Sequence, residues 1–68
     1  MWVANDILNI NGEDLKEVTI YNALGQIVYS KHLQGNSFKT SLELPAGAYT
    51  AKASSKTSVE TTKFVITK

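Results

Sequence analysis

The chain has 68 residues, which is room for one domain with a small core. It has no cysteine, so disulfides and thiol chemistry are excluded. The net charge is +1 and every cation is a lysine, which argues against binding to nucleic acid or to anionic lipid. So small a domain without covalent cross-links is typical of a module of a larger chain or of an oligomer.

Short runs of strand-forming residues alternate with turn residues, and no segment has helical periodicity. The sequence predicts six strands, at residues 7–10, 17–21, 26–32, 37–44, 49–53 and 59–67. One flat layer of such strands would have no dry core, so they should form two packed sheets. We therefore predict an all-β fold, a small antiparallel β-sandwich of about six to seven strands. The chain is expected to be a single domain, with a first short strand in residues 1–16 and the core in residues 17–68.

Two corners divide these runs. Residues 22–25 read Asn-Ala-Leu-Gly and predict a type I turn, in which Asn22 takes the first position and Gly25 adopts the left-handed conformation of a bulge. Residues 44–49 read Leu-Pro-Ala-Gly-Ala-Tyr, a Pro/Gly corner with a tyrosine at its exit. This pattern resembles the tyrosine corner of immunoglobulin-like (Ig-like) sandwiches, in which the hydroxyl bonds to backbone a few residues upstream. It favours an Ig-like sandwich over a barrel.

We expect five residues of these corners to maintain the shape of the domain: Gly25, Leu44, Pro45, Gly47 and Tyr49.

Reactive side chains are scarce. His32 is the single imidazole, and at a strand end it is expected to be a solvated edge residue rather than a zinc ligand. Serines and threonines fall on alternating strand positions, as on the outward face of a sheet, rather than beside a base. A weak calcium site at residues 11–14 and a sugar-stacking platform of aromatic residues are alternatives. The aromatic residues in question are Trp2, Tyr21, Tyr29 and Tyr49. We predict no enzyme activity, no metal and no cofactor.

Three segments together resemble a known family. Residues 18–29 (VTIYNALGQIVY) are similar to the v-x-I-Y-[DN]-x-x-G-x-x-V segment of type IX secretion C-terminal sorting domains. Residues 44–49 (LPAGAY) resemble the L-P-x-G-x-Y of that family, and residues 62–68 (TKFVITK) resemble its closing K-K-[FI]-V-[IV]-x-K strand. The resemblance covers residues 17–68. The Y-P-N-P segment with which members commonly begin has no match here, so we expect residues 1–5 to be a trimmed or divergent start.

The resemblance implies a fold and a role. Such a domain is an Ig-like sandwich at the C-terminus of a cargo protein that an ordinary signal peptide exports to the periplasm. Components of the type IX translocon recognise it and move the cargo across the outer membrane of a Gram-negative bacterium. A sortase-like cysteine protease at the cell surface then usually removes it and links the cargo to anionic lipopolysaccharide, or releases the cargo. The partners implied are therefore the translocon, the protease and the N-terminal cargo.

The last strand is a candidate contact surface. If it lies at a sheet edge, its unpaired backbone groups can add to a strand of a partner. The contact residues expected there are Lys63, Val65, Thr67 and Lys68. An incomplete sandwich also exposes an edge through which the isolated domain is expected to form a homodimer. The alternatives are an Ig-like or fibronectin-like spacer or adhesion module of a surface protein and, third, a small carbohydrate-binding module.

Overall fold

The computed structural model describes residues 1–67, which form seven strands. Within that range there is no helix, and so none long and apolar enough to cross a membrane. The strands are β1 (Trp2–Ala4), β2 (Ile7–Asn11), β3 (Leu15–Asn22), β4 (Ile27–His32), β5 (Ser37–Ser41), β6 (Gly47–Ser55) and β7 (Val59–Ile66). The all-β prediction is confirmed.

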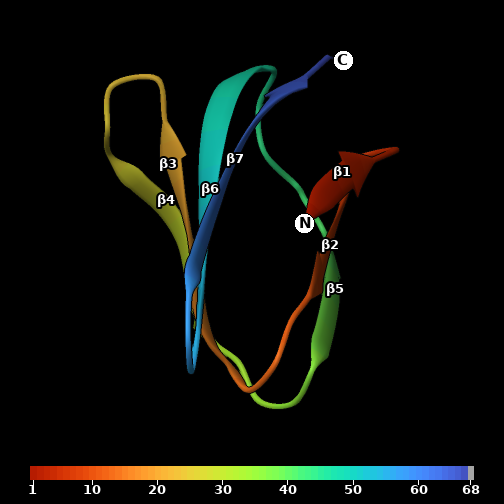
Figure 1. The fold of residues 1–68 in the computed structure, drawn as a ribbon. Coiled ribbons are helices and arrows are strands. Elements are labelled where there is room, and N and C mark those ends of the chain that lie inside the picture. The colour runs from red at the N-terminus through yellow and green to blue at the C-terminus, as the bar shows by residue number, and fades with distance from the viewer. Residues whose placement is uncertain (68) are drawn as a thin grey trace.

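The strands form two antiparallel sheets that face each other (Figure 1). The smaller sheet has the order β1-β2-β5, and the larger has the order β4-β3-β6-β7. The predicted two-layer sandwich is therefore confirmed, with β7 at one edge of the larger sheet.

The core lies between the two inner faces. Val18 and Ile20 are fully buried on the inner face of β3, as their alternation predicted. On β7, Ile66 is buried and Phe64 packs against the core, whereas Val65 points outward and is 65% exposed. The buried apolar residues are Leu8, Ile10, Leu15, Val18, Ile20, Leu33, Leu42, Tyr49, Ala51, Ala53 and Ile66.

All six predicted strands differ somewhat in length from those of the structure: β2, β4 and β7 differ by one residue, and the strand expected at residues 17–21 extends over Leu15–Asn22. The other two strands differ because of the topology. The strand expected at residues 37–44 ends at Ser41, because the chain then leaves the smaller sheet to reach the start of β6 in the larger one. Leu42 and Leu44 still pack inward, which is why they read as part of the alternation. The strand expected at residues 49–53 extends over Gly47–Ser55, because β6 is paired on both sides along most of its length.

The strand β1 was not predicted, because three residues are too few to show an alternating pattern. It is joined to β2 by the two residues Asn5 and Asp6, which have φ angles of 52° and 60°. Positive φ at both central positions is the mark of a type I′ hairpin turn, for which Asn and Asp are favoured residues. The Asn-Asp pair was therefore the available sequence signal for this hairpin.

At the opposite end of the sandwich, the two chain crossings between the sheets are bonded to each other. The amide of Gly12 donates to the carbonyl of Asn36 at 2.9 Å, and that of Leu15 donates to the carbonyl of Gly35 at 2.9 Å. In Figure 1 these crossings lie at the bottom. They hold the two sheets together where the hydrogen-bonded ladders end.

Candidate functional site

The three segments that carry the family resemblance meet at one end of the larger sheet. The turn after β3, the start of β6 and the end of β7 all lie at the top of Figure 1. They line one open groove with a volume of about 670 Å³, within the usual size range of binding pockets. The lining residues are Tyr21, Asn22, Ala23, Gly25, Ala48, Tyr49, Thr50, Lys63, Phe64 and Val65.

The first wall of this motif groove is the turn between β3 and β4. The side-chain oxygen of Asn22 accepts hydrogen bonds from the amides of Leu24 at 2.9 Å and Gln26 at 3.0 Å. The amide of Gly25 donates to the carbonyl of Asn22 at 3.0 Å, and Gly25 has a φ of 82°. The predicted turn with a left-handed glycine is therefore confirmed. Its shape is fixed by bonds within the segment itself.

The second wall is the start of β6, to which Ala48 and Tyr49 contribute; the corner residues Leu44, Pro45 and Gly47 lie before it and do not line the groove. The hydroxyl of Tyr49 donates to the carbonyl oxygen of Pro45 at 2.6 Å, which confirms the predicted tyrosine corner. The Tyr49 ring is 8% exposed and stacks on Phe64, with ring centroids 5.7 Å apart and planes at 22°. Gly47 has a φ of 157°, which residues with a side chain rarely adopt. Leu44 lies half-buried against the core.

The outward face of the motif groove is mostly apolar. Tyr21 and Lys63 lie on either side of Thr50 in one cross-strand row, and Ala48 pairs with Val65 in the next. Paired residues share a face of the sheet, so Tyr21, Ala48 and Val65 form an apolar surface beside the charged Lys63. Asn22 and Phe64 were not among the predicted site residues, and Tyr21 was named only for the sugar-stacking alternative. Each lies in one of the family-like segments, which was the signal for including them.

The free edge of β7 adjoins this groove. At the hairpin between β6 and β7, the amide of Ser55 donates to the carbonyl of Ser58 at 2.8 Å, so this is a hydrogen-bonded pair. Antiparallel pairs alternate between bonded and non-bonded, and the register from Ser54↔Val59 to Gly47↔Ile66 is uninterrupted. The even-numbered residues of β7 therefore bond to β6. The amides and carbonyls of the odd-numbered residues from Val59 to Val65 face the open edge.

The predicted contact residues lie along this edge. Lys63 and Val65 are exposed on β7, and Thr67 is exposed just beyond it. Lys68 lies outside the described residues. At Lys63 and Val65, the same residue therefore directs its backbone amide and carbonyl to the open edge and exposes its side chain on the outer face of the sheet.

The other candidates do not form sites. The side chain of His32 is 93% exposed and its Nδ1 is 4.0 Å from Glu17 Oε2, so it is a solvated edge residue as predicted. The four aromatic residues do not make one platform. Trp2 lies in the smaller sheet, Tyr49 is buried, and Tyr29 packs toward the core while Tyr21 faces outward.

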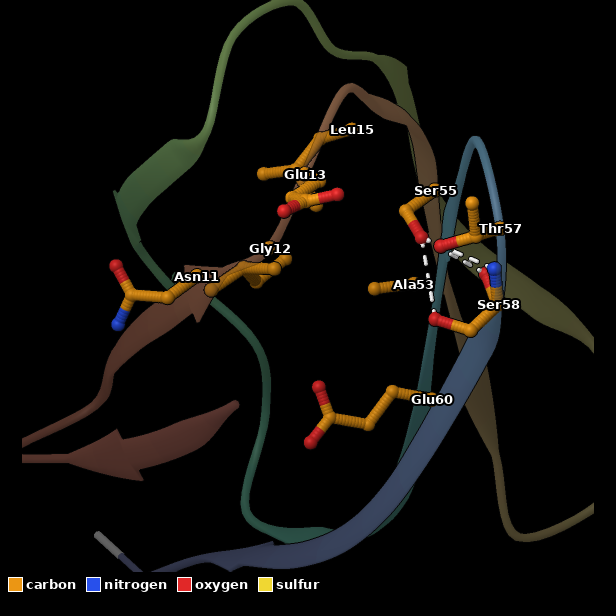
Figure 2. A pocket seen from close by; sticks show the side chains of 10 residues that line it. Asn11, Gly12, Glu13, Leu15, Ala53, Ser55, Thr57, Ser58 and Glu60 are labelled. Carbon is orange, nitrogen blue, oxygen red and sulfur yellow. Dashed lines mark hydrogen bonds between the residues drawn. The ribbon is translucent and has the colours of Figure 1, made fainter.

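A second, smaller cavity of about 240 Å³ lies between the sheets near residues 11–14 (Figure 2). Glu13 lines it from the crossing between β2 and β3 and Glu60 lines it from β7, but within residues 1–67 no group of three or more His, Cys, Asp or Glu side chains is placed to hold a metal ion. The calcium alternative therefore gains no support here.

Comparison with known proteins identifies the family. A family model described as secretion system C-terminal sorting domain matches residues 4–67, which extends the resemblance into the first strands. The chain has no significant match among curated proteins or solved structures. Because the matched range is nearly the whole chain, the protein belongs to the secretion system C-terminal sorting domains, the sorting signals of type IX secretion.

Proposed function

We propose that this domain directs an attached N-terminal cargo across the outer membrane, and that the type IX translocon recognises it through the free edge of β7 and the motif groove beside it. One observation carries the proposal: the three family-like segments, which are far apart in the sequence, all contribute residues to one groove. That groove lies beside β7, the edge strand of the larger sheet.

Strand addition suits a signal that is read on many cargos. The amides and carbonyls at the odd positions of β7 offer hydrogen bonds to any extended partner strand, whatever its side chains. Specificity then comes from the exposed side chains beside them. Val65 offers an apolar contact, and Lys63 favours a partner that carries an acidic group.

A signal of this kind must keep one shape behind unrelated proteins. The groove walls are fixed by bonds inside the domain, namely the Asn22 turn and the contact of the Tyr49 hydroxyl with Pro45. Because these bonds need no partner and no cargo, the groove is preorganised for recognition. Gly25, Leu44, Pro45, Gly47 and Tyr49 maintain the surface, and Lys63, Val65, Thr67 and Lys68 contact the partner.

We propose further that the domain has no catalytic activity of its own and serves as the substrate of the export pathway. After export, a sortase-like cysteine protease at the cell surface removes it and attaches the cargo to anionic lipopolysaccharide or releases it. The support is the family role. In a strain that exports a fusion protein, the released cargo is then expected to be smaller by the mass of the domain, 7.4 kDa, or more, depending on where cleavage falls, and the surface-attached cargo is expected to lack the domain and to carry lipopolysaccharide.

The test of recognition removes one edge donor without touching the fold. Val65→Pro deletes an amide that faces the open edge, and the hydrogen bonds to β6 are left in place. Val65→Thr keeps the amide and the β-branched shape and is the matched control. Each variant is fused behind a periplasmic reporter in a bacterium with type IX export, and surface reporter is measured. We expect Val65→Thr to be exported and Val65→Pro to remain in the periplasm.

Circular dichroism of the purified variants checks that both are folded. Export of a folded Val65→Pro variant at the level of the unaltered domain would refute recognition at the β7 edge. If a fusion carrying the unaltered domain stays in the periplasm, the sorting function itself is wrong. Placing the domain in front of the reporter distinguishes a spacer, since a spacer would behave alike in both positions.

A further inference from the structure

The sandwich has an opening on the side where β1 and β7 lie. The strand β1 covers only the first part of β2, since its three residues pair with Ile7, Leu8 and Asn9. Beyond them the cavity of about 240 Å³ opens between the two sheets (Figure 2). Gly12 lies on the β2 side of this opening, and Ala53 and Glu60 lie on the side of the larger sheet.

The backbone of Asn11 faces this opening. At the two ends of β2, the amide of Leu42 donates to the carbonyl of Asp6 and the amide of Gly12 donates to the carbonyl of Asn36. Even-numbered residues of β2 therefore bond toward β5, and odd-numbered ones bond toward β1. Asn11 is the odd-numbered residue past the end of β1, so its amide and carbonyl point to the place where a longer β1 would run.

The start of β1 lies at the mouth of the opening. The Met1 nitrogen is 3.2 Å from Glu60 Oε1 on the inner face of β7. In the established register, the residue immediately before Met1 would pair with Asn11, and the residue two before it would pair with Gly12. The inward side chains of β1 are Val3 and Met1, both packed on the core, while Trp2 points outward. The residue two before Met1 therefore points inward.

The cavity suits an apolar side chain at that inward position. Its inner lining includes Ile10, Leu15 and Ala53, which are buried, and Gly12 contributes no side chain. A volume of about 240 Å³ exceeds the roughly 150 Å³ of an apolar cavity that accommodates benzene. The carboxylates of Glu13 and Glu60 at the lining disfavour an acidic residue there.

We infer that this opening is the docking site of the segment that joins the cargo to the domain. The segment continues β1 along β2, bonds to Asn11 and places an apolar side chain between the sheets, two residues before Met1. The inference rests on the proposed function insofar as a cargo precedes the domain. The sandwich is then complete only when the domain is joined to its cargo. The stability of the sorting domain therefore depends on the segment that joins the two.

The test uses the 68-residue chain with two N-terminal extensions of identical composition. Gly-Val-Thr places Val two residues before Met1, facing inward, and Gly-Thr-Val reverses the two faces. We expect the amide of Asn11 to exchange with solvent at least about tenfold more slowly in both extended chains than in the unextended one. We expect Tm to be higher by about 4–8 °C for Gly-Val-Thr than for Gly-Thr-Val, because burial of one aliphatic side chain gives a shift of this order.

Any of three results would overturn the inference. The first is an Asn11 amide that exchanges equally fast with and without the extension, and the second is an equal Tm for the two extensions. The third is protection of Asn11 in the unextended chain that rises with protein concentration together with a dimer by light scattering, since a second copy would then occupy the opening. None of these measurements involves export, so failure here and failure of the sorting function are separate outcomes.

Discussion

The two ends of the sandwich are built differently. At the motif end, side chains bond to nearby backbone: Asn22 to the turn that follows it, and Tyr49 to Pro45 four residues earlier. At the opposite end, the crossings are held mainly by backbone contacts between distant segments, such as that of Gly12 with Asn36, although the β6–β7 turn also has local bonds from Ser55, and a cavity remains between the sheets. The motif end therefore keeps its shape through local bonds, whereas the opposite end relies mainly on contacts between distant segments and leaves a cavity that can accept a further side chain.

The strand β7 runs from one end to the other and gives the largest expected contrast. Ile66 at the motif end is 1% exposed, and Val59 at the far end is 58% exposed. Ile66→Ala is expected to reduce the free energy of unfolding by about 2–5 kcal/mol, because it removes buried methyl groups and leaves a cavity. Val59→Ala should change it by less than about 0.5 kcal/mol. Urea denaturation measures the free energy of unfolding of both variants. Similar losses would mean that the two ends of β7 contribute equally to stability.

The tyrosine corner gives the next effect. Tyr49→Phe keeps the ring stacked on Phe64 but leaves the Pro45 carbonyl without its 2.6 Å donor, which should cost about 1–2 kcal/mol. Tyr29→Phe is the matched control, because within residues 1–67 the Tyr29 hydroxyl makes no hydrogen bond. Thermal unfolding of the two variants compares them. A Tyr49→Phe variant as stable as the control would show that the hydroxyl contact does not hold the corner.

The smallest change in stability is expected from two hairpin turns, the one that follows β3 and the one between β6 and β7. Asn22→Ala removes two bonds to backbone amides at the motif end and should cost about 1 kcal/mol. Ser55 bonds within the Ser55–Ser58 turn at the opposite end, with its hydroxyl 3.2 Å from the Ser58 amide. The same hydroxyl donates to the Ser58 carbonyl at 3.1 Å, and because both bonds are longer than those that Asn22 accepts, Ser55→Ala should cost about 0.5 kcal/mol or less. Chemical denaturation measures the free energy of unfolding of both variants. A larger loss for Ser55→Ala than for Asn22→Ala would contradict the idea that local bonds hold the motif end.

Much of the fold was predictable because its signals are local. Alternation places Val18 and Ile20 inside, and it places Val65 opposite to Phe64 and Ile66. The Tyr49 corner and the Asn22 turn were also predictable, since each depends on residues within four positions of one another. The hairpin at Asn5 and Asp6 carried a local signal too, but the strand before it is too short to register as a pattern.

The sequence by itself determined which segments are strands, which residues turn the chain and which family the motifs belong to. The tertiary structure alone decided that these motifs line one groove, that the odd positions of β7 face an open edge, and that Asn11 faces an opening between the sheets. The reason is range: turns and side-chain alternation follow from neighbouring residues, whereas strand order and edges depend on pairings between residues far apart in the chain.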